Sequence, residues 1–229
     1  MAVYVEKYKA LTSELKEKNV TLVAVSKIRS KEEILELYNL GQRDFGENYV
    51  QELVEKQLLL PKDIRWHYIG HLQSNKVKYI APFVHLIQSV DSFKLLLEID
   101  RQGSKINRRI NCLLQVHIAM EDTKYGLFER ELDELVSGIT KAVELNQLNN
   151  VKICGLMGMA SFSDDEHKIR AELKYLSTLY DKYSHINTPN FHFSKLSMGM
   201  SNDYAIALEE GSNMIRIGSL LFGQRKANA

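Results

Sequence analysis

Short apolar segments alternate with longer charged segments along the chain, and this alternation constrains the fold more than any other feature. The apolar segments carry Val, Ile and Leu at consecutive positions, which is typical of strands buried on both faces. The charged segments place apolar residues at helical spacing. The expected strands are 21–26, 43–48, 65–70, 84–91, 110–118, 151–158, 191–199 and 213–219.

Each expected strand is followed by an expected helix, and a further helix over about residues 2–18 precedes the first strand. The helix over 31–40 has the clearest start, because Ser30 is placed as an N-cap and Glu33 completes a capping box. Eight such pairs in 229 residues favour a (β/α)8 TIM barrel, a fold of ~250 residues. We expect residues 1–229 to form this barrel as a single domain.

A doubly wound open sheet is the alternative architecture, and the glycines argue against it. Such sheets usually carry a GxGxxG fingerprint after the first strand, but no two of the 12 glycines are separated by a single residue. The segment 41–48 has the glycine spacing of a P-loop. However, Glu47 and Asn48 stand where Lys and Ser or Thr are required. A nucleotide-binding fold is therefore disfavoured.

Charge and composition exclude several classes of protein. Thirty basic and 29 acidic residues leave a net charge of +1, which argues against nucleic-acid or anionic-membrane partners. No apolar run approaches the ~20 residues of a membrane span, and the charged first 18 residues do not form a secretory signal. Cys112 and Cys154 lie in apolar runs, as reduced buried thiols do. We expect a cytoplasmic protein, with a monomer as the default.

Motifs for metal or hydrolytic chemistry are absent from the sequence. It contains no HExxH, CxxC or GxSxG. His67 and His71 are spaced like metal ligands, but their position at a strand end provides no helical face to hold an ion. We interpret both as hydrogen-bonded barrel residues, and expect no metal site.

Lys27 directly follows the expected strand 21–26, so its side chain starts at the end of a barrel where active sites lie. A primary amine condenses with an aldehyde only when it is neutral. A low-dielectric site with a second cation, such as Arg216, lowers the pKa of a lysine from ~10.4. Lys27 therefore has the features of an imine-forming lysine, although a lysine that merely leads into a loop would look the same.

Small residues and glycines follow the last two expected strands, in the segments 196–201 and 216–223. Barrels often bind phosphate with these loops and a short helix N-terminus. Gly218 and Ser219 suit that role, and Ser197 would add a hydroxyl group. The glycines by themselves would also fit tight turns, but together with Lys27 they favour a phosphorylated aldehyde as ligand.

Seven segments of the sequence resemble the pyridoxal phosphate homeostasis protein family, which is itself similar to the barrel domain of alanine racemase. They extend in order from residue 24 to 223, nearly the whole chain. They are AVSK (24–27), FGENYVQE (45–52), WHYIGHLQSNK (66–76), SVDS (89–92), GLMGMA (155–160), LSMGMSND (196–203) and RIGSLLFG (216–223). One departure is that His117 and Ala119 stand where the family often has Asn.

The resemblance implies a barrel that holds pyridoxal 5′-phosphate (PLP) as a Schiff base on Lys27 and serves vitamin B6 homeostasis, with apo PLP-dependent enzymes as candidate partners. It implies that Arg216 contacts the pyridine nitrogen and that three residues contact the phosphate. Two more positions lie in motifs near the cofactor. The implied phosphate contacts are Ser197, Gly218 and Ser219, and the two nearby positions are Asn48 and Met157.

The residue chemistry further predicts little or no turnover and no catalytic residue. An arginine cannot supply the proton that makes the PLP ring a strong electron sink. Alanine racemase takes its second base, a tyrosine, from an additional domain, whereas this sequence ends ten residues after Ser219. Two alternatives stay open. One is a weak amino-acid racemase using Tyr49 or His71, and the other is a Schiff-base aldolase acting on a sugar phosphate.

Overall fold

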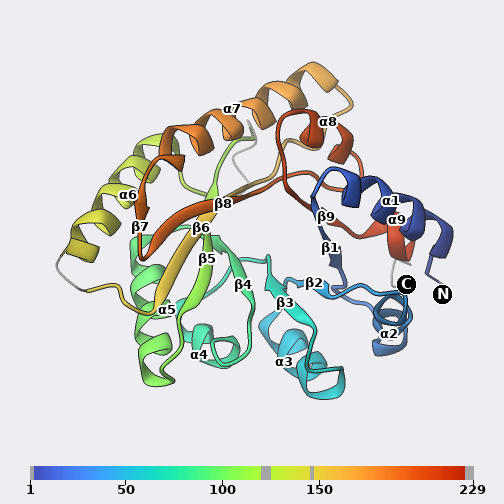
Figure 1. The fold of residues 1–229 in the computed structure, drawn as a ribbon, viewed down its shortest axis with the longest axis horizontal. Helices are drawn as coiled ribbons and strands as arrows, with labels where there is room; N and C mark the ends of the chain where they lie inside the picture. The colour runs from blue at the N-terminus through green and yellow to red at the C-terminus, as the bar shows by residue number, and fades with distance from the viewer. Residues whose placement is uncertain (1–2, 120–124, 145–146, 225–229) are drawn as a thin grey trace.

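A computed structural model describes residues 3–119, 125–144 and 147–224 and shows a closed barrel of eight parallel strands (Figure 1). Neighbouring strands pair in chain order, and β9 pairs with β1 while β6 pairs with β8, which closes the ring. The predicted (β/α)8 fold is therefore confirmed. The barrel strands are β1 Thr21–Val25, β2 Asp44–Glu47, β3 Arg65–Tyr68, β4 Leu86–Val90, β5 Ile110–Val116, β6 Val151–Gly158, β8 Phe191–Ser197 and β9 Met214–Ile217.

Helices surround the barrel on its outside (Figure 1). The capping box at Ser30 and Glu33 is present as predicted. The leading helix lies beside the last one, where Tyr4 N donates to Leu221 O at 2.8 Å. The helices are α1 Val5–Glu17, α2 Lys31–Asn39, α3 Val50–Leu59, α4 Val77–Ile80, α5 Phe93–Lys105, α6 Glu129–Glu144, α7 Glu166–Ser184, α8 Tyr204–Glu209 and α9 Ser219–Phe222, with a 3₁₀ turn η1 Ser74–Lys76 before α4.

One short strand was not predicted from the sequence. This strand, β7 (Asn187–Thr188), pairs antiparallel with β8. Two residues are too few to produce a hydrophobic period, so the pattern carries no signal for it. The pairing of β6 with β8 is also irregular next to Gly155, which has a φ of +148° and allows the backbone of Lys195 to come close.

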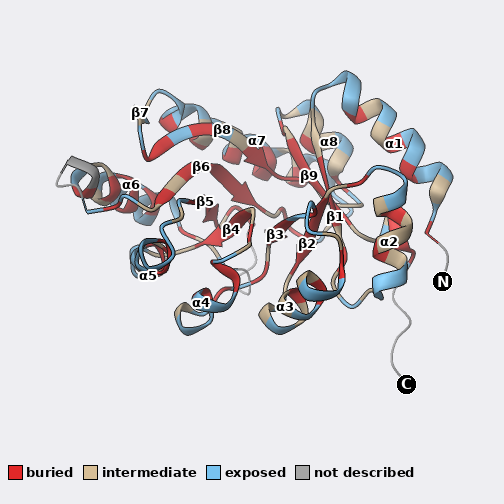
Figure 2. Ribbon diagram, turned by 60° about the horizontal axis from the view of Figure 1, so that its bottom comes forward, coloured by how far each residue is buried: buried red, intermediate tan, exposed pale blue. Residues whose placement is uncertain are grey.

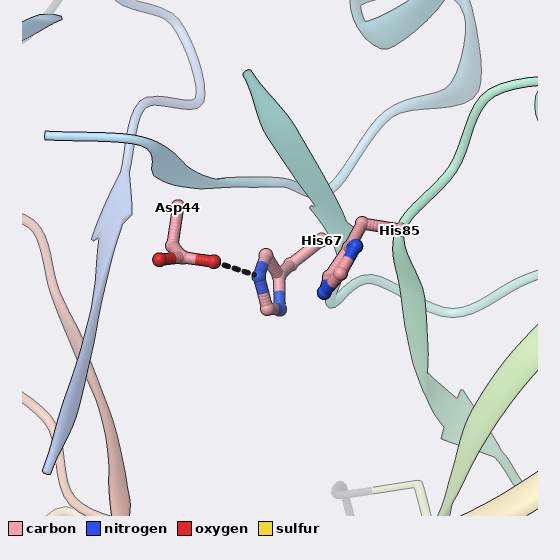
Figure 3. Close-up of side chains that lie close together, drawn as sticks. All are labelled: Asp44, His67 and His85. Carbon is pink, nitrogen blue, oxygen red and sulfur yellow. Dashed lines mark hydrogen bonds and ion pairs between the residues drawn. The ribbon is translucent and has the colours of Figure 1, made fainter. Parts of the chain in front are cut away.

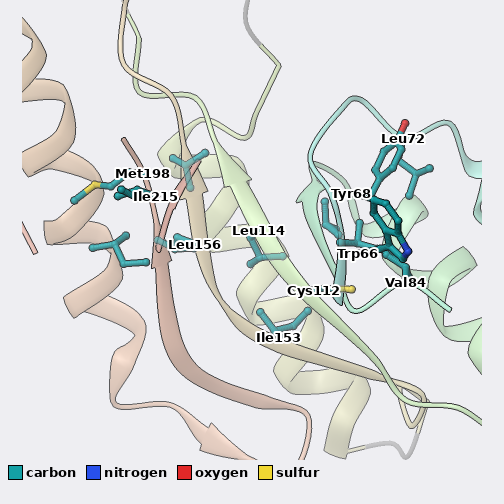
Figure 4. Close-up of a cluster of buried hydrophobic side chains, with 14 of the residues drawn as sticks. Trp66, Tyr68, Leu72, Val84, Cys112, Leu114, Ile153, Leu156, Met198 and Ile215 are labelled. Carbon is teal, nitrogen blue, oxygen red and sulfur yellow. The ribbon is translucent and has the colours of Figure 1, made fainter. Parts of the chain in front are cut away.

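The core has two parts, one inside the barrel and one between the strands and the helices. Figure 2 shows buried strands and helices that expose their outer faces. Figure 4 shows part of the larger cluster, which includes Trp66, Leu114 and Leu156. The smaller cluster fills the barrel with side chains that alternate with the outward ones, as the two-residue strand period requires. It consists of Val23, Leu86, Leu113, Cys154, Met157 and Met214.

The two cysteines lie in the core, as their apolar sequence context predicts. Cys112 and Cys154 are buried and form no disulfide. In the described part of the chain, no helix combines the length and the apolar character that crossing a bilayer requires.

Candidate functional site

A cavity of about 910 Å³ opens where β1, β6, β8 and β9 end. Its lining brings together Lys27, Arg216, Gly218 and Ser219. These residues come from the first and last strands and their loops, which meet because β9 pairs with β1 to close the barrel. Four of the seven candidate residues therefore share one site, at the end of the barrel where the chemistry of this fold takes place.

The backbone on both sides of Lys27 forms hydrogen bonds with side chains of α3. Lys56 Nζ donates to Ser26 O at 2.7 Å, and Ile28 N donates to Glu52 Oε1 at 2.6 Å. Ile28 has a φ of 61°, a left-handed conformation that is unfavourable for a β-branched residue. The contacts to α3 offset this strain, so the half-buried Lys27 side chain extends into the cavity from a fixed point.

A buried ion pair lies behind Lys27, between the barrel and α3. Lys56 Nζ contacts Glu47 Oε1 at 2.8 Å and Glu52 Oε1 at 2.6 Å, and Ser26 Oγ donates to Glu47 Oε1 at 2.6 Å. The Glu47 side chain is completely buried. Burial raises the pKa of Glu47 to about 7, although the attraction to Lys56 opposes this rise. Lys56 could not be predicted as part of the site from the sequence, because a lysine in an amphipathic helix normally faces solvent.

Arg216 is buried, with 4% of its surface exposed. Its Nη1 donates to Ser197 Oγ at 2.6 Å and its Nη2 donates to Gly158 O at 2.8 Å. Among the described residues these hydrogen bonds go to a hydroxyl and a carbonyl, and none goes to a carboxylate. Burial lowers the pKa of Arg216 to about 10. The cavity thus presents a buried cation that can donate further hydrogen bonds to an acceptor or anion.

Gly218 and Ser219 lead from β9 into α9. The Gly218 N–H faces Ser201 Oγ at 3.4 Å. The N–H groups in the first turn of a helix have no acceptor within that helix, and they favour negative charge. This turn therefore suits the phosphate role that the sequence suggests for Gly218 and Ser219.

Three candidate residues do not belong to the described lining of this cavity. Ser197 Oγ lies between Arg216 and Gln88. Met157 is completely buried inside the barrel. Asn48 lines a second cavity of about 720 Å³ beside α3 and α4. Sequence order alone could not separate these positions, because all three lie near the carboxyl ends of strands.

Tyr49 and His71, the two candidates for a second base, line the second cavity with Asn48. Tyr49 is exposed over 56% of its surface. The His71 ring stacks on Tyr125, and its Nδ1 lies 3.3 Å from Asp91. His67 has other partners inside the barrel, so the two histidines do not face a common ligand.

The family described as "Alanine racemase, N-terminal domain" matches residues 5–226. A protein of Aquifex aeolicus named "Pyridoxal phosphate homeostasis protein" is 39% identical over 206 residues, which cover 90% of this chain and 87% of that protein. PipY of Synechococcus elongatus is 35% identical, and the match covers 95% of this chain and 99% of the PipY chain. Its structure without PLP gives a TM-score of 0.85, and its structure with PLP bound gives 0.82. Alanine racemase of Bartonella henselae shares the fold, with a TM-score of 0.67 and 15% sequence identity. The match covers 99% of this chain and 62% of the racemase chain.

Proposed function

The chain belongs to the pyridoxal phosphate homeostasis protein family, and from this we propose that it binds PLP covalently and serves PLP homeostasis. The observation that carries the proposal is the cavity that four candidate residues share. It combines the amine of Lys27, the buried guanidinium of Arg216 and a turn at Gly218 and Ser219 that suits a phosphate. PLP contains the matching groups: an aldehyde, a ring nitrogen that accepts hydrogen bonds, and a phosphate. The relative PipY, which was solved with PLP bound, supports this choice of ligand.

The four candidate residues that line the cavity would each have a distinct part in holding the ligand. Lys27 Nζ would hold the aldehyde carbon covalently as an imine, with loss of water. Arg216 would donate to the ring nitrogen, and Gly218 and Ser219 would contact the phosphate. Once bound, PLP supplies a reactive carbonyl and an electron sink. Ser197, predicted as a phosphate contact, would instead act through its hydrogen bond with Arg216, whereas for Asn48 and Met157 a place near the cofactor stays a prediction from the sequence.

We expect the bound cofactor to undergo little turnover. Arg216 can only donate hydrogen bonds, so it leaves the ring nitrogen unprotonated and the electron sink weak. No tyrosine or histidine belongs to the described lining of the Lys27 cavity, and Tyr49 and His71 line the other cavity. The names of the relatives support a role in PLP homeostasis. We further propose that the protein, of net charge +1, is a cytoplasmic monomer with a single domain and holds PLP for apo-enzymes.

The visible absorption spectrum tests the proposal directly. We expect the purified protein, after incubation with PLP, to show a yellow band that borohydride removes by reducing the imine to a stable amine. The residue labelled by this reduction should be Lys27, identified by mass spectrometry of peptides. A colourless protein that borohydride inactivates only in the presence of a sugar phosphate would favour the aldolase alternative instead.

Deuterium exchange at Cα of alanine tests the expected lack of turnover. Because Arg216 leaves the electron sink weak and no tyrosine or histidine belongs to the described lining of the cavity, we expect the PLP-loaded protein to exchange this proton far more slowly than an enzyme, whose turnover is typically about 10 s⁻¹. Proton NMR in D₂O measures the exchange, with free PLP at equal concentration as control. Exchange at an enzyme-like rate would contradict the prediction and support a racemase.

A further inference from the structure

A chain of four hydrogen bonds runs through the barrel interior and ends at Arg216. Asp44 Oδ1 lies 2.9 Å from His67 Nε2, a contact drawn as a dashed line in Figure 3, and His67 Nδ1 lies 3.0 Å from Gln88 Nε2. Gln88 Oε1 accepts from Ser197 Oγ at 2.6 Å, and Ser197 Oγ accepts from Arg216 Nη1 at 2.6 Å. The chain therefore connects the start of β2 with the residue that faces the ligand cavity.

Every donor in this chain points away from Arg216. An arginine has no acceptor, so Ser197 accepts its hydrogen and must use its own hydrogen for Gln88 Oε1. The amide nitrogen of Gln88 then donates to His67 Nδ1, which leaves the proton of His67 on Nε2, facing Asp44. One arrangement of hydrogens thus satisfies all five side chains, with a cation at one end and a carboxylate at the other.

The surroundings of the chain fix this arrangement. His67, Gln88 and Ser197 are each at most 1% exposed, so water does not compete for their hydrogen bonds. Burial lowers the pKa of His67, although its bond to Asp44 opposes this, so the ring stays neutral. Burial alone would raise the pKa of Asp44, but hydrogen bonds from Arg65 and His67 hold that pKa well below its usual value.

We propose that Gln88 and His67 are positioning residues, which orient the Ser197 hydroxyl and thereby hold Arg216 in place for the ligand in the Lys27 cavity. This inference rests on the proposed function, since it concerns the same site. Within the described chain, the Ser197 hydroxyl is the only side-chain group that accepts a hydrogen bond from Arg216. Gln88 accepts the hydrogen of this hydroxyl and so sets its direction. Losing the amide would free the hydroxyl to rotate and would loosen the guanidinium.

Figure 3 also shows His85 beside Asp44 and His67, and these three residues have the composition of a metal site. Their ligand atoms all lie within 4.8 Å of one another. However, both carboxylate oxygens of Asp44 already accept hydrogen bonds from Arg65. Because of this salt bridge, Asp44 is better suited to end the chain of hydrogen bonds than to coordinate a cation.

The test replaces Gln88 with Met, which keeps the length of the side chain and removes its amide. We expect the Kd for PLP, measured by titrating cofactor-free protein and following the visible band, to rise about tenfold, which corresponds to about 1.4 kcal/mol. Gln88→Glu keeps an acceptor for the Ser197 hydroxyl but loses the donor to His67 Nδ1, so we expect its Kd to rise less than that of Gln88→Met, by about threefold. A residue needed only for packing would not separate these two variants.

His85→Leu provides the matched control. The His85 ring lies 5.5 Å from that of His67 but is outside the chain, so we expect an unchanged Kd. If Gln88→Met does not fold, as judged by thermal unfolding without PLP, His67→Phe replaces it and should raise the Kd at least threefold. Normal PLP binding by Gln88→Met or by this substitute would overturn the positioning role but leave the proposed function intact. Failure of the wild-type protein to bind PLP would instead overturn the proposed function.

Discussion

Replacing Lys27 with alanine is expected to abolish the covalent attachment of PLP completely. The Schiff base needs a primary amine, and Lys27 is the one lysine in the described lining of the cavity that also holds Arg216 and the turn at Gly218. The yellow band of the PLP-loaded protein should therefore disappear. After borohydride reduction, intact-mass spectrometry should show no added PLP.

Lys76→Ala is the matched control, because Lys76 lines the second cavity and does not belong to the described lining of the first. We expect this variant to keep both the band and the mass increase. Lys27→Ala should also keep weaker, reversible PLP binding, because the groups that contact the ring and the phosphate remain. The assignment would be refuted by a Lys27→Ala protein that retains the same band and is still labelled after reduction.

The barrel could be predicted from the sequence because its strands are buried on both faces. Segments such as 151–158 are apolar at nearly every position, and β6 has exactly these bounds. The residues of the Lys27 cavity were predictable for a related reason. Active-site groups of a barrel lie at the carboxyl ends of its strands, so listing polar residues at those ends finds Lys27 and Arg216 together.

The supporting residues could not be predicted in the same way. Lys56 occupies an ordinary position in α3, and only the packing of that helix against β2 shows that its charge is buried. Gln88 lies inside an apolar strand, where a polar residue signals a buried partner but does not identify it. Its neighbours His67 and Ser197 come from other strands. Hydrogen bonds of this kind depend on how strands are registered in three dimensions.

Replacing Lys56 with Met is expected to destabilise the protein by about 3–5 kcal/mol, the usual result of leaving one partner of a buried ion pair uncompensated. The Glu47 side chain is completely buried and that of Lys56 is 9% exposed, so solvent cannot replace the lost partner. Chemical unfolding at pH 8 measures the change in the free energy of unfolding. Lys62→Met, at an exposed lysine after the same helix, should change this free energy little.

The destabilisation should also depend on pH, because the contact of Lys56 with Glu47, unlike its contact with Glu52, is an ion pair only when Glu47 is charged. Burial raises the pKa of folded Glu47 to about 7, whereas an unfolded glutamate has a pKa of about 4.3. Between these values the folded state binds a proton that the unfolded state lacks, so this group makes stability fall as the pH rises. At pH 5 Glu47 is largely protonated in the folded state, and Lys56→Met should therefore destabilise less than at pH 8. Adding Glu47→Gln should restore much of the loss, and a purely additive double variant would contradict the ion-pair explanation.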